Sequence, residues 1–212
     1  MHLLRDIFKI DKDEALNFAA SRGFGLLTAF DGRRPCGSHL PFVIRREDDK
    51  AIISTHVTAA NPLAALASEG RSFLLAVTGA DAYVSNDWYK TSDQVSTWLY
   101  EAVHLTGPGR LVPSHGNRSH GDDLLTIFEA RLAPKNPWTL ATMESRKRSA
   151  MLAGIKVIEI DVELIEGQRK INQHKPDEDH VSVVNALEQS GKDGGQKIAG
   201  MMRDLRPHLT YG

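Results

Sequence analysis

Apolar and polar residues alternate over several short stretches of the 212-residue chain, which is the pattern of β-strands with one buried and one wet face. The clearest stretch is IKVIEIDVELIEG at 155–167, where apolar Ile158, Ile160, Val162 and Leu164 alternate with acidic Glu159, Asp161 and Glu163. Further strands are expected at 25–30, 35–44, 51–56, 73–77, 82–84 and 100–112, with residues 45–50 as a turn and residues 78–80 as an interruption.

Capping signals and helical spacing separate these strands. Asp11 followed by Glu14 has the form of a capping box, and Asn61 before Pro62 is a typical helix start. One helix is expected from Asp11 to Gly23 and another from Asn61 to Gly70. Further helices are expected at 124–132, 143–153 and 177–187, and once more within the last twenty residues.

Many short strands with helices inserted singly predict a mainly β protein, an antiparallel β-barrel with peripheral helices, instead of a doubly wound sheet. The length suits one large domain, so we expect the barrel and its inserted helices over 1–175 and a helical extension packed on the same domain over 176–212.

Composition removes several functional classes. The formal net charge is −1, which gives no bulk attraction to nucleic acid or to an acidic membrane. Cys36 is the single cysteine, so no internal disulfide forms, and no apolar run approaches a membrane span. The N-terminal segment turns acidic too early for a secretory signal, so cytoplasmic localisation is expected. The chain contains no GxGxxG, P-loop or CxxC motif.

Five of the seven Trp and Tyr residues lie between 83 and 104, around a polar loop. Such amphipathic rings suit a surface that covers a flat ligand or a partner chain. Equally, they can plug the mouth of a small barrel and contact nothing else.

The segment STHVTAANP at 54–62 ends a strand and starts a helix. The unpartnered N–H groups at a helix start favour a phosphate, and Thr55, His56 and Thr58 can add donors. An ordinary helix cap explains Asn61 and Pro62 as well.

The segment RKINQHKP at 169–176 places cationic and amide side chains at a strand end. Alternation puts Lys170, Asn172 and His174 on one face. A flavin ring needs donors at its carbonyls and nitrogens and a cation near N1, which a Lys and a Gln can supply. A solvated strand end is the alternative.

Metal and nucleophilic sites are not expected. Glu159, Asp161 and Glu163 lie along a strand without converging, so a solvated or lysine-paired face is the favoured interpretation. Neither the strand pair His39 and His104 nor the loop pair His115 and His120 has zinc spacing, and no Ser, His and Asp set can be assembled from sequence order.

Five segments together resemble the PaiB family of FMN-binding split-barrel proteins. They are SHLPF at 38–42, THVTAANP at 55–62, AYVSNDWY at 82–89, STWLYEAVH at 96–104 and KINQHKP at 170–176, in the order and spacing of that family. The resemblance implies a six-stranded split barrel related to the pyridoxamine phosphate oxidase fold. It also implies a homodimer with FMN at the subunit interface.

On the family pattern, Ser38, His39, Leu40 and Pro41 run beside the flavin ring through backbone groups. Thr55, His56 and Asn61 surround the phosphate. Trp88, Tyr89, Trp98 and Tyr100 form the dimer-interface wall, and Lys170 with Gln173 reaches the ring or ribityl chain. This chain departs from the family's PTWNY and KLSQN patterns at Leu99, Asn172 and His174, and it has SNDWY where the family has SPxWY.

Three functions remain open on the sequence. The first is an FMN-binding transcriptional regulator of the PaiB type, with DNA as a partner by resemblance only, since no helix-turn-helix pattern is present. The second is a flavin-dependent oxidoreductase acting on a small substrate or a nicotinamide donor. The third is a flavin-free split barrel that serves as an interaction module or haem binder.

Overall fold

The computed structural model describes residues 1, 5–47 and 50–212. The strands are β1 (Lys9–Ile10), β2 (Phe24–Phe30), β3 (Pro35–Glu47), β4 (Lys50–Thr58), β5 (Ser72–Val84), β6 (Thr97–Leu111), β7 (Ile155–Val162) and β8 (Leu164–Lys170). The helices are α1 (Lys12–Arg22), α2 (Pro62–Ser68), α3 (Asn117–Ala130), α4 (Ser145–Ala153), α5 (Asp177–Gln189) and α6 (Asp193–Leu205).

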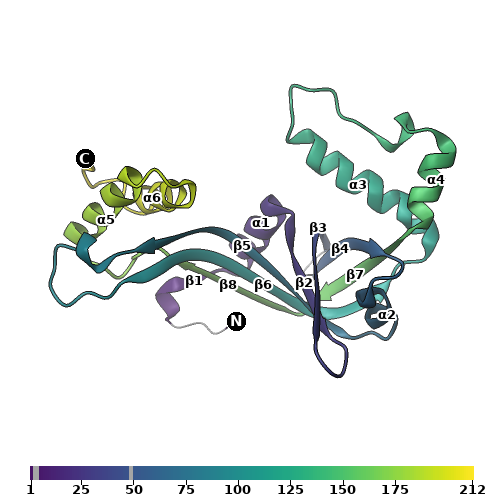
Figure 1. The fold of residues 1–212 in the computed structure, drawn as a ribbon, viewed down its shortest axis with the longest axis horizontal. Helices are drawn as coiled ribbons and strands as arrows, with labels where there is room; N and C mark the ends of the chain where they lie inside the picture. The colour runs from purple at the N-terminus through teal and green to yellow at the C-terminus, as the bar shows by residue number, and fades with distance from the viewer. Residues whose placement is uncertain (2–4, 48–49) are drawn as a thin grey trace. The chain divides into compact units, whose positions relative to one another are not determined.

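The strands form an antiparallel sheet in the order β1-β8-β6-β5-β2-β3-β4-β7, and a further pairing of β6 with β7 closes six of them into a ring (Figure 1). β8 and β1 extend the sheet beyond β6. The expected antiparallel barrel with peripheral helices is therefore confirmed, including its six-stranded ring.

The chain divides into two compact units, each built from separated segments. The first unit comprises Met1–Ala15, Thr78–Val103 and Glu166–Gly212, and the second comprises Leu16–Val77 and His104–Ile165. The long strands β5 and β6 contribute to both units. The division expected at residue 175 stays a prediction.

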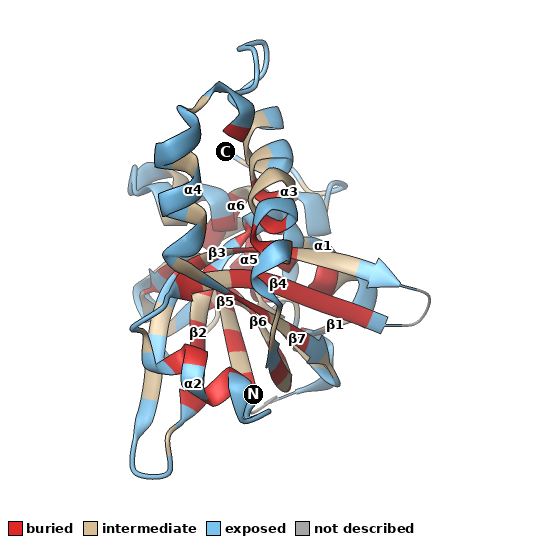
Figure 2. Ribbon diagram, turned by 90° about the vertical axis from the view of Figure 1, so that its right-hand side faces the viewer, coloured by how far each residue is buried: buried red, intermediate tan, exposed pale blue. Residues whose placement is uncertain are grey.

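β4 forms the most buried part of the second unit (Figure 2). One of its faces carries Ile53, Thr55 and Val57, and the register places Ile160 and Ile158 beside the first two. The other face carries Ser54 and His56, and α3 reaches it through His120. Because both faces of this strand are covered, its polar residues Ser54 and Thr55 are buried and hydrogen-bonded inside the protein.

The core of the first unit forms between the parts of β5 and β6 that belong to this unit and the helices α5 and α6. The two helices pack side by side (Figure 1). Its members include Val84, Tyr89, Leu99, Ile171, Val183, Val184, Leu187, Ile198 and Met202. The C-terminal segment therefore forms a complete helix with an apolar face that contributes to this core.

Two strand predictions were wrong. β5 runs without a break through residues 78–80, because sheet pairing overrides a weak local signal. The stretch 155–167 divides at Glu163, whose N–H donates to the Thr106 carbonyl, so Leu164 is 50% exposed instead of buried. The predicted turn at 45–50 includes residues 48–49, which lie outside the described residues.

Among the helices that the structure describes, none combines the length and the apolar character that crossing a bilayer requires.

Candidate functional site

Two side-chain hydrogen bonds hold the β3 segment Ser38–Pro41 against β4 and the start of α2. The Thr55 hydroxyl donates to the Pro41 carbonyl at 2.7 Å, and the Asn61 amide donates to the Ser38 hydroxyl at 2.9 Å. The Asn61 side-chain oxygen accepts from the Leu63 N–H at 3.0 Å, as an N-cap residue does. Thr55 and Asn61 therefore shape this segment with polar atoms that are already partnered inside the protein.

The same β3 segment is paired on one side and open on the other. β2 pairs with β3 over Pro35–Pro41, whereas the β3–β4 register begins only at Phe42 opposite Thr55. Within the described part of the chain, Ser38–Pro41 thus has no strand partner on its β4 side. Backbone N–H and C=O groups alternate along a strand, so this edge presents donors and acceptors to a planar ligand.

His39 and Leu40, the remaining predicted residues of this segment, face different surroundings. Leu40 is buried, and the His39 ring is exposed and stacks on Phe24 with centroids 6.3 Å apart. The segment therefore presents its backbone and the Ser38 and His39 side chains outward.

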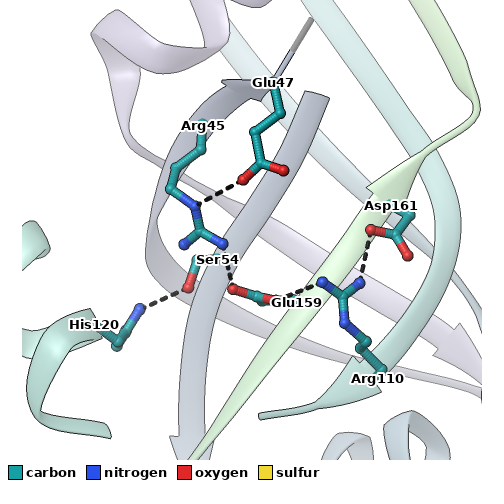
Figure 3. Close-up of polar contacts among 7 residues, drawn as sticks. All are labelled: Arg45, Glu47, Ser54, Arg110, His120, Glu159 and Asp161. Atoms are coloured by element: carbon teal, nitrogen blue, oxygen red, sulfur yellow. Dashed lines mark hydrogen bonds and ion pairs between the residues drawn. The ribbon is translucent and has the colours of Figure 1, made fainter. Parts of the chain in front are cut away.

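His56 lies on the face of β4 opposite to Thr55, is half-buried, and belongs to a hydrogen-bonded chain of side chains. His56 Nδ1 is 2.9 Å from His120 Nε2. His120 Nδ1 is in turn 2.9 Å from the Ser54 hydroxyl (Figure 3). Burial lowers the pKa of His56, and burial together with His56 and Arg45 lowers the pKa of His120 to about 4. Both rings are therefore neutral at pH 7, and Ser54, 1% exposed, is inaccessible as a nucleophile.

The acidic residues of β7 are paired with arginines (Figure 3). Glu159 accepts from Arg45 at 2.5 Å and from Arg110 at 2.6 Å, and Arg110 also donates to Asp161 at 2.6 Å. The partners are thus arginines where lysines or water were expected. No three His, Cys, Asp or Glu side chains in the described ranges come together to hold a metal ion.

The first unit contains a cavity of about 400 Å³ that we call the cationic pocket. Its lining residues are Arg5, Phe8, Tyr89, Asp93, Gln94, Val95, Ser96, Thr97, Lys170, Asn172, His174 and Lys175. Lys170 Nζ donates to the Thr97 hydroxyl at 2.5 Å, and Lys175 donates to the Gln94 side-chain oxygen. Lys170, Asn172 and His174, which alternation predicted on one face, all line this pocket. Lys175, which alternation predicted on the opposite face, lines it as well, because the left-handed Asn172 ends the strand geometry.

The predicted aromatic residues separate into three environments. Tyr89 lines the cationic pocket, whereas Trp88 and Trp98 line a second cavity of about 410 Å³ together with Tyr83. The Tyr100 hydroxyl accepts from the Gln168 amide. Tyr83 and Trp98 are 51% and 54% exposed and meet edge to face at 6.0 Å, so they form an exposed aromatic pair.

Gln173 supports the turn after β8 and does not line the cationic pocket. Its side-chain oxygen accepts from the Ile171 N–H at 2.7 Å, and its amide donates to the Arg169 carbonyl. Asn172 is fully buried and has a positive φ of 62°. Its side-chain oxygen accepts from the Tyr89 hydroxyl at 3.4 Å. These bonds fix the turn that carries His174 and Lys175.

Sequence reasoning missed Arg5 and His120. Arg5 gives no local signal because it precedes the first strand and meets the pocket through the fold. Alternation puts the polar Ser54 and His56 on one face of β4, which indicates a polar partner there. That partner is His120, which lies 64 residues beyond His56, so no local pattern identifies it.

Comparison with known proteins identifies a family for this chain. Residues 1–164 match the family model described as "Putative FMN-binding domain". A curated relative, "Protease synthase and sporulation protein PAI 2" of Bacillus subtilis, is 26% identical over 93% of this chain and 94% of its own length.

Solved structures agree on the fold. The FAD and heme binding protein of Mycobacterium smegmatis has a TM-score of 0.57 and 17% identity, over 80% of this chain and 76% of its own. The flavocytochrome Anf3 of Azotobacter vinelandii has a TM-score of 0.56 and 16% identity, over 84% of this chain and 78% of its own. The resemblance to the PaiB family is thereby confirmed, and this chain belongs to the FMN-binding domain family that its first 164 residues match.

Proposed function

We propose that this protein binds FMN, with the flavin ring beside the open edge of β3 at Ser38–Pro41. The observation that carries the proposal is this edge, which is held by Thr55 and Asn61 and left without a strand partner among the described residues. Membership of the FMN-binding family supports it independently.

The groups at this edge suit a flavin. Its ring carries carbonyls and nitrogens that require donors and acceptors in one plane, which a strand edge supplies. Ser38 accepts from Asn61, so its own O–H remains available to donate. When bound, FMN would supply electron or hydride transfer, and the residues of this segment would position its ring.

The wider set of site residues is proposed from the family pattern. It contains Ser38, His39, Leu40, Pro41, Thr55, His56 and Asn61 in the second unit and Trp88, Tyr89, Trp98, Tyr100, Lys170 and Gln173 in the first. For Thr55, Asn61 and Gln173 we propose positioning roles, because their side chains are bonded to the protein itself.

We also propose a homodimer with the flavin at the interface. The exposed pair of Tyr83 and Trp98 supports this assembly, since large exposed aromatic side chains are enriched at protein interfaces. A regulatory role is proposed on the family resemblance. It predicts DNA binding that weakens steeply with salt.

The absorption spectrum of the purified protein is the first test. Flavin bands support the proposal, a Soret band supports the haem alternative, and a colourless protein that takes up no added FMN overturns it. Anaerobic addition of NADH or NADPH then distinguishes a flavin that accepts hydride, as an oxidoreductase requires, from one that does not.

The matched variants Thr55→Val and Thr28→Val test the site. Both remove a hydroxyl that donates to a carbonyl, of Pro41 and of Leu74 respectively, but only Thr55 holds the open edge. We expect Thr55→Val to weaken FMN binding in a fluorescence titration at least about tenfold, which corresponds to about 1.4 kcal/mol. Equal affinities of the two variants would contradict the placement of the flavin.

A further inference from the structure

The cationic pocket of the first unit gathers positive charge that nearby carboxylates offset only in part. Arg5, Lys170 and Lys175 line it with His174, and Asp93 is the only carboxylate among its lining residues. Lys170 and Lys175 donate to a hydroxyl and to an amide oxygen, both neutral acceptors. Within the described residues, none of these three cations forms an ion pair with a carboxylate.

The Asp179 carboxylate interacts electrostatically with Lys175, but its hydrogen bonds go to the loop after Tyr89. Asp179 accepts from the Lys90 N–H at 2.7 Å, the Thr91 N–H at 2.9 Å and the Thr91 hydroxyl at 2.6 Å. It therefore anchors the loop after Tyr89. The Lys175 ammonium instead lies 4.8 Å from the centre of the Tyr89 ring.

The cations repel one another at short range. Burial first, and then Arg5 and Lys175, lowers the pKa of Lys170. Burial, followed by Lys175, Arg5 and Lys170, lowers the pKa of His174. Such mutual repulsion destabilises the empty arrangement, and a bound anion relieves it.

The pocket is also preformed. The turn that carries His174 and Lys175 is fixed by the left-handed Asn172 and by Gln173, and Lys170 ends a paired strand. Ser96 and Thr97 add hydroxyl groups, and Phe8, Tyr89 and Val95 supply an apolar side. Its volume of about 400 Å³ lies in the range of small-molecule sites.

We propose that this pocket binds the phosphate group of a small organic phosphate, with the apolar side receiving the organic part. Lysines act as point charges for phosphate, and the neighbouring hydroxyl groups can donate to its oxygens. The phosphate belongs either to FMN or to a second ligand, and competition distinguishes these sources. In the first case the inference rests on the proposed FMN binding, to which Lys170 and Tyr89 already belong; in the second it does not.

Isothermal titration of the full-length protein with inorganic pyrophosphate at low ionic strength tests the proposal. We expect saturable binding that sodium chloride at equal ionic strength does not reproduce. Lys170→Met and Lys175→Met should each weaken binding at least tenfold. Lys197→Met is the matched control, because Lys197 is an exposed lysine on α6 of the same unit that pairs with Asp193 outside the pocket.

Thermal unfolding shows whether each variant is folded. Because arginine keeps the positive charge, Lys170→Arg should bind pyrophosphate more tightly than Lys170→Met. If FMN displaces pyrophosphate and riboflavin does not, the phosphate is that of FMN. If FMN and pyrophosphate bind together, a second phosphorylated ligand uses the pocket.

Absence of saturable pyrophosphate binding would overturn the proposal, as would an equal loss in Lys197→Met. Either result leaves the flavin proposal standing, because that one is tested at Thr55.

Discussion

His56 Nδ1 lies 2.9 Å from His120 Nε2, so a half-buried imidazole on β4 meets a buried one on α3, and both are neutral at pH 7. A neutral pair can share one hydrogen, with one ring donating and the other accepting. Protonation of both rings would place two donors and two like charges face to face. The junction between α3 and β4 should therefore be sensitive to acid.

We expect stability to fall as the pH drops from about 6.5, the ordinary histidine pKa, towards 4. Because the folded pKa of His120 lies below its ordinary value, at about 4, the unfolded chain binds more protons throughout this window. The loss should be on the order of 3 kcal/mol, complete near pH 4 and absent above pH 7.

Urea unfolding between pH 7.5 and 4 measures this loss. His120→Gln should flatten the pH profile, whereas His115→Gln, at an exposed position before α3, should leave it unchanged. A His120→Gln profile as steep as that of the parent protein would exclude His120 as the cause.

The buried Glu101 and the half-buried Arg169 form an ion pair in the first unit. Glu101 is 6% exposed and accepts from Arg169 at 2.8 Å and 2.5 Å, and Arg169 also reaches the more exposed Glu14. Glu101→Gln leaves the half-buried Arg169 with the more exposed Glu14 as its carboxylate partner, so it should lower the free energy of unfolding by about 2 kcal/mol.

The matched change Glu14→Gln should cost less than about 1 kcal/mol, because a solvent-exposed pair is well screened. Chemical denaturation of both variants provides the comparison. Similar losses in the two would mean that burial does not control this network.

Asn172 occupies the left-handed region with φ of 62°. Asn172→Gly and Asn172→Ala both remove the hydrogen bond to Tyr89, but only alanine meets steric strain at this φ. Asn172→Ala should therefore be less stable than Asn172→Gly by about 1 kcal/mol.

Tyr89→Phe isolates the hydrogen bond, so its loss in stability should resemble that of Asn172→Gly. Thermal melts of the three variants separate strain from bonding. Equal stability of the alanine and glycine variants would show that the turn relaxes.

Trp98→Ala tests the proposed dimer. Trp98 is 54% exposed beside Tyr83, and burial of such a side chain commonly dominates an interface. We expect the dimer dissociation constant to rise at least about tenfold by sedimentation velocity, which corresponds to about 1.4 kcal/mol. Trp138→Ala, a 39% exposed tryptophan of the second unit, is the control. If the dimer dissociation constant of Trp98→Ala equals that of the parent protein, the interface does not include Trp98.

Several features of the fold were predictable because their signals are local. The predicted cap at Asp11 is present, with the Glu14 N–H donating to its side chain at 2.8 Å, whereas the Glu14 carboxylate pairs with Arg169. Asn61 caps α2 as predicted. The continuity of β5 was missed, because Gly79 suggests a break that sheet pairing overrides.

The candidate site was predictable only as a set of residues. The motifs selected Lys170 and Tyr89, which share the cationic pocket, but they also grouped Trp98 and Trp88 with Tyr89, and these tryptophans line another cavity. Thr55 and His56, neighbours in one motif, point to opposite faces of β4, because consecutive strand residues alternate.

The sequence by itself determined the positions of most strands and helices and the family, since periodicity, caps and ordered motifs depend on nearby residues. The tertiary structure alone decided which polar atoms remain available. It partnered Asn61 with Ser38 and His56 with His120, and it brought Arg5 to the pocket of Lys170. Such partnerships join residues far apart in the chain, and only the packing of whole elements sets their distances.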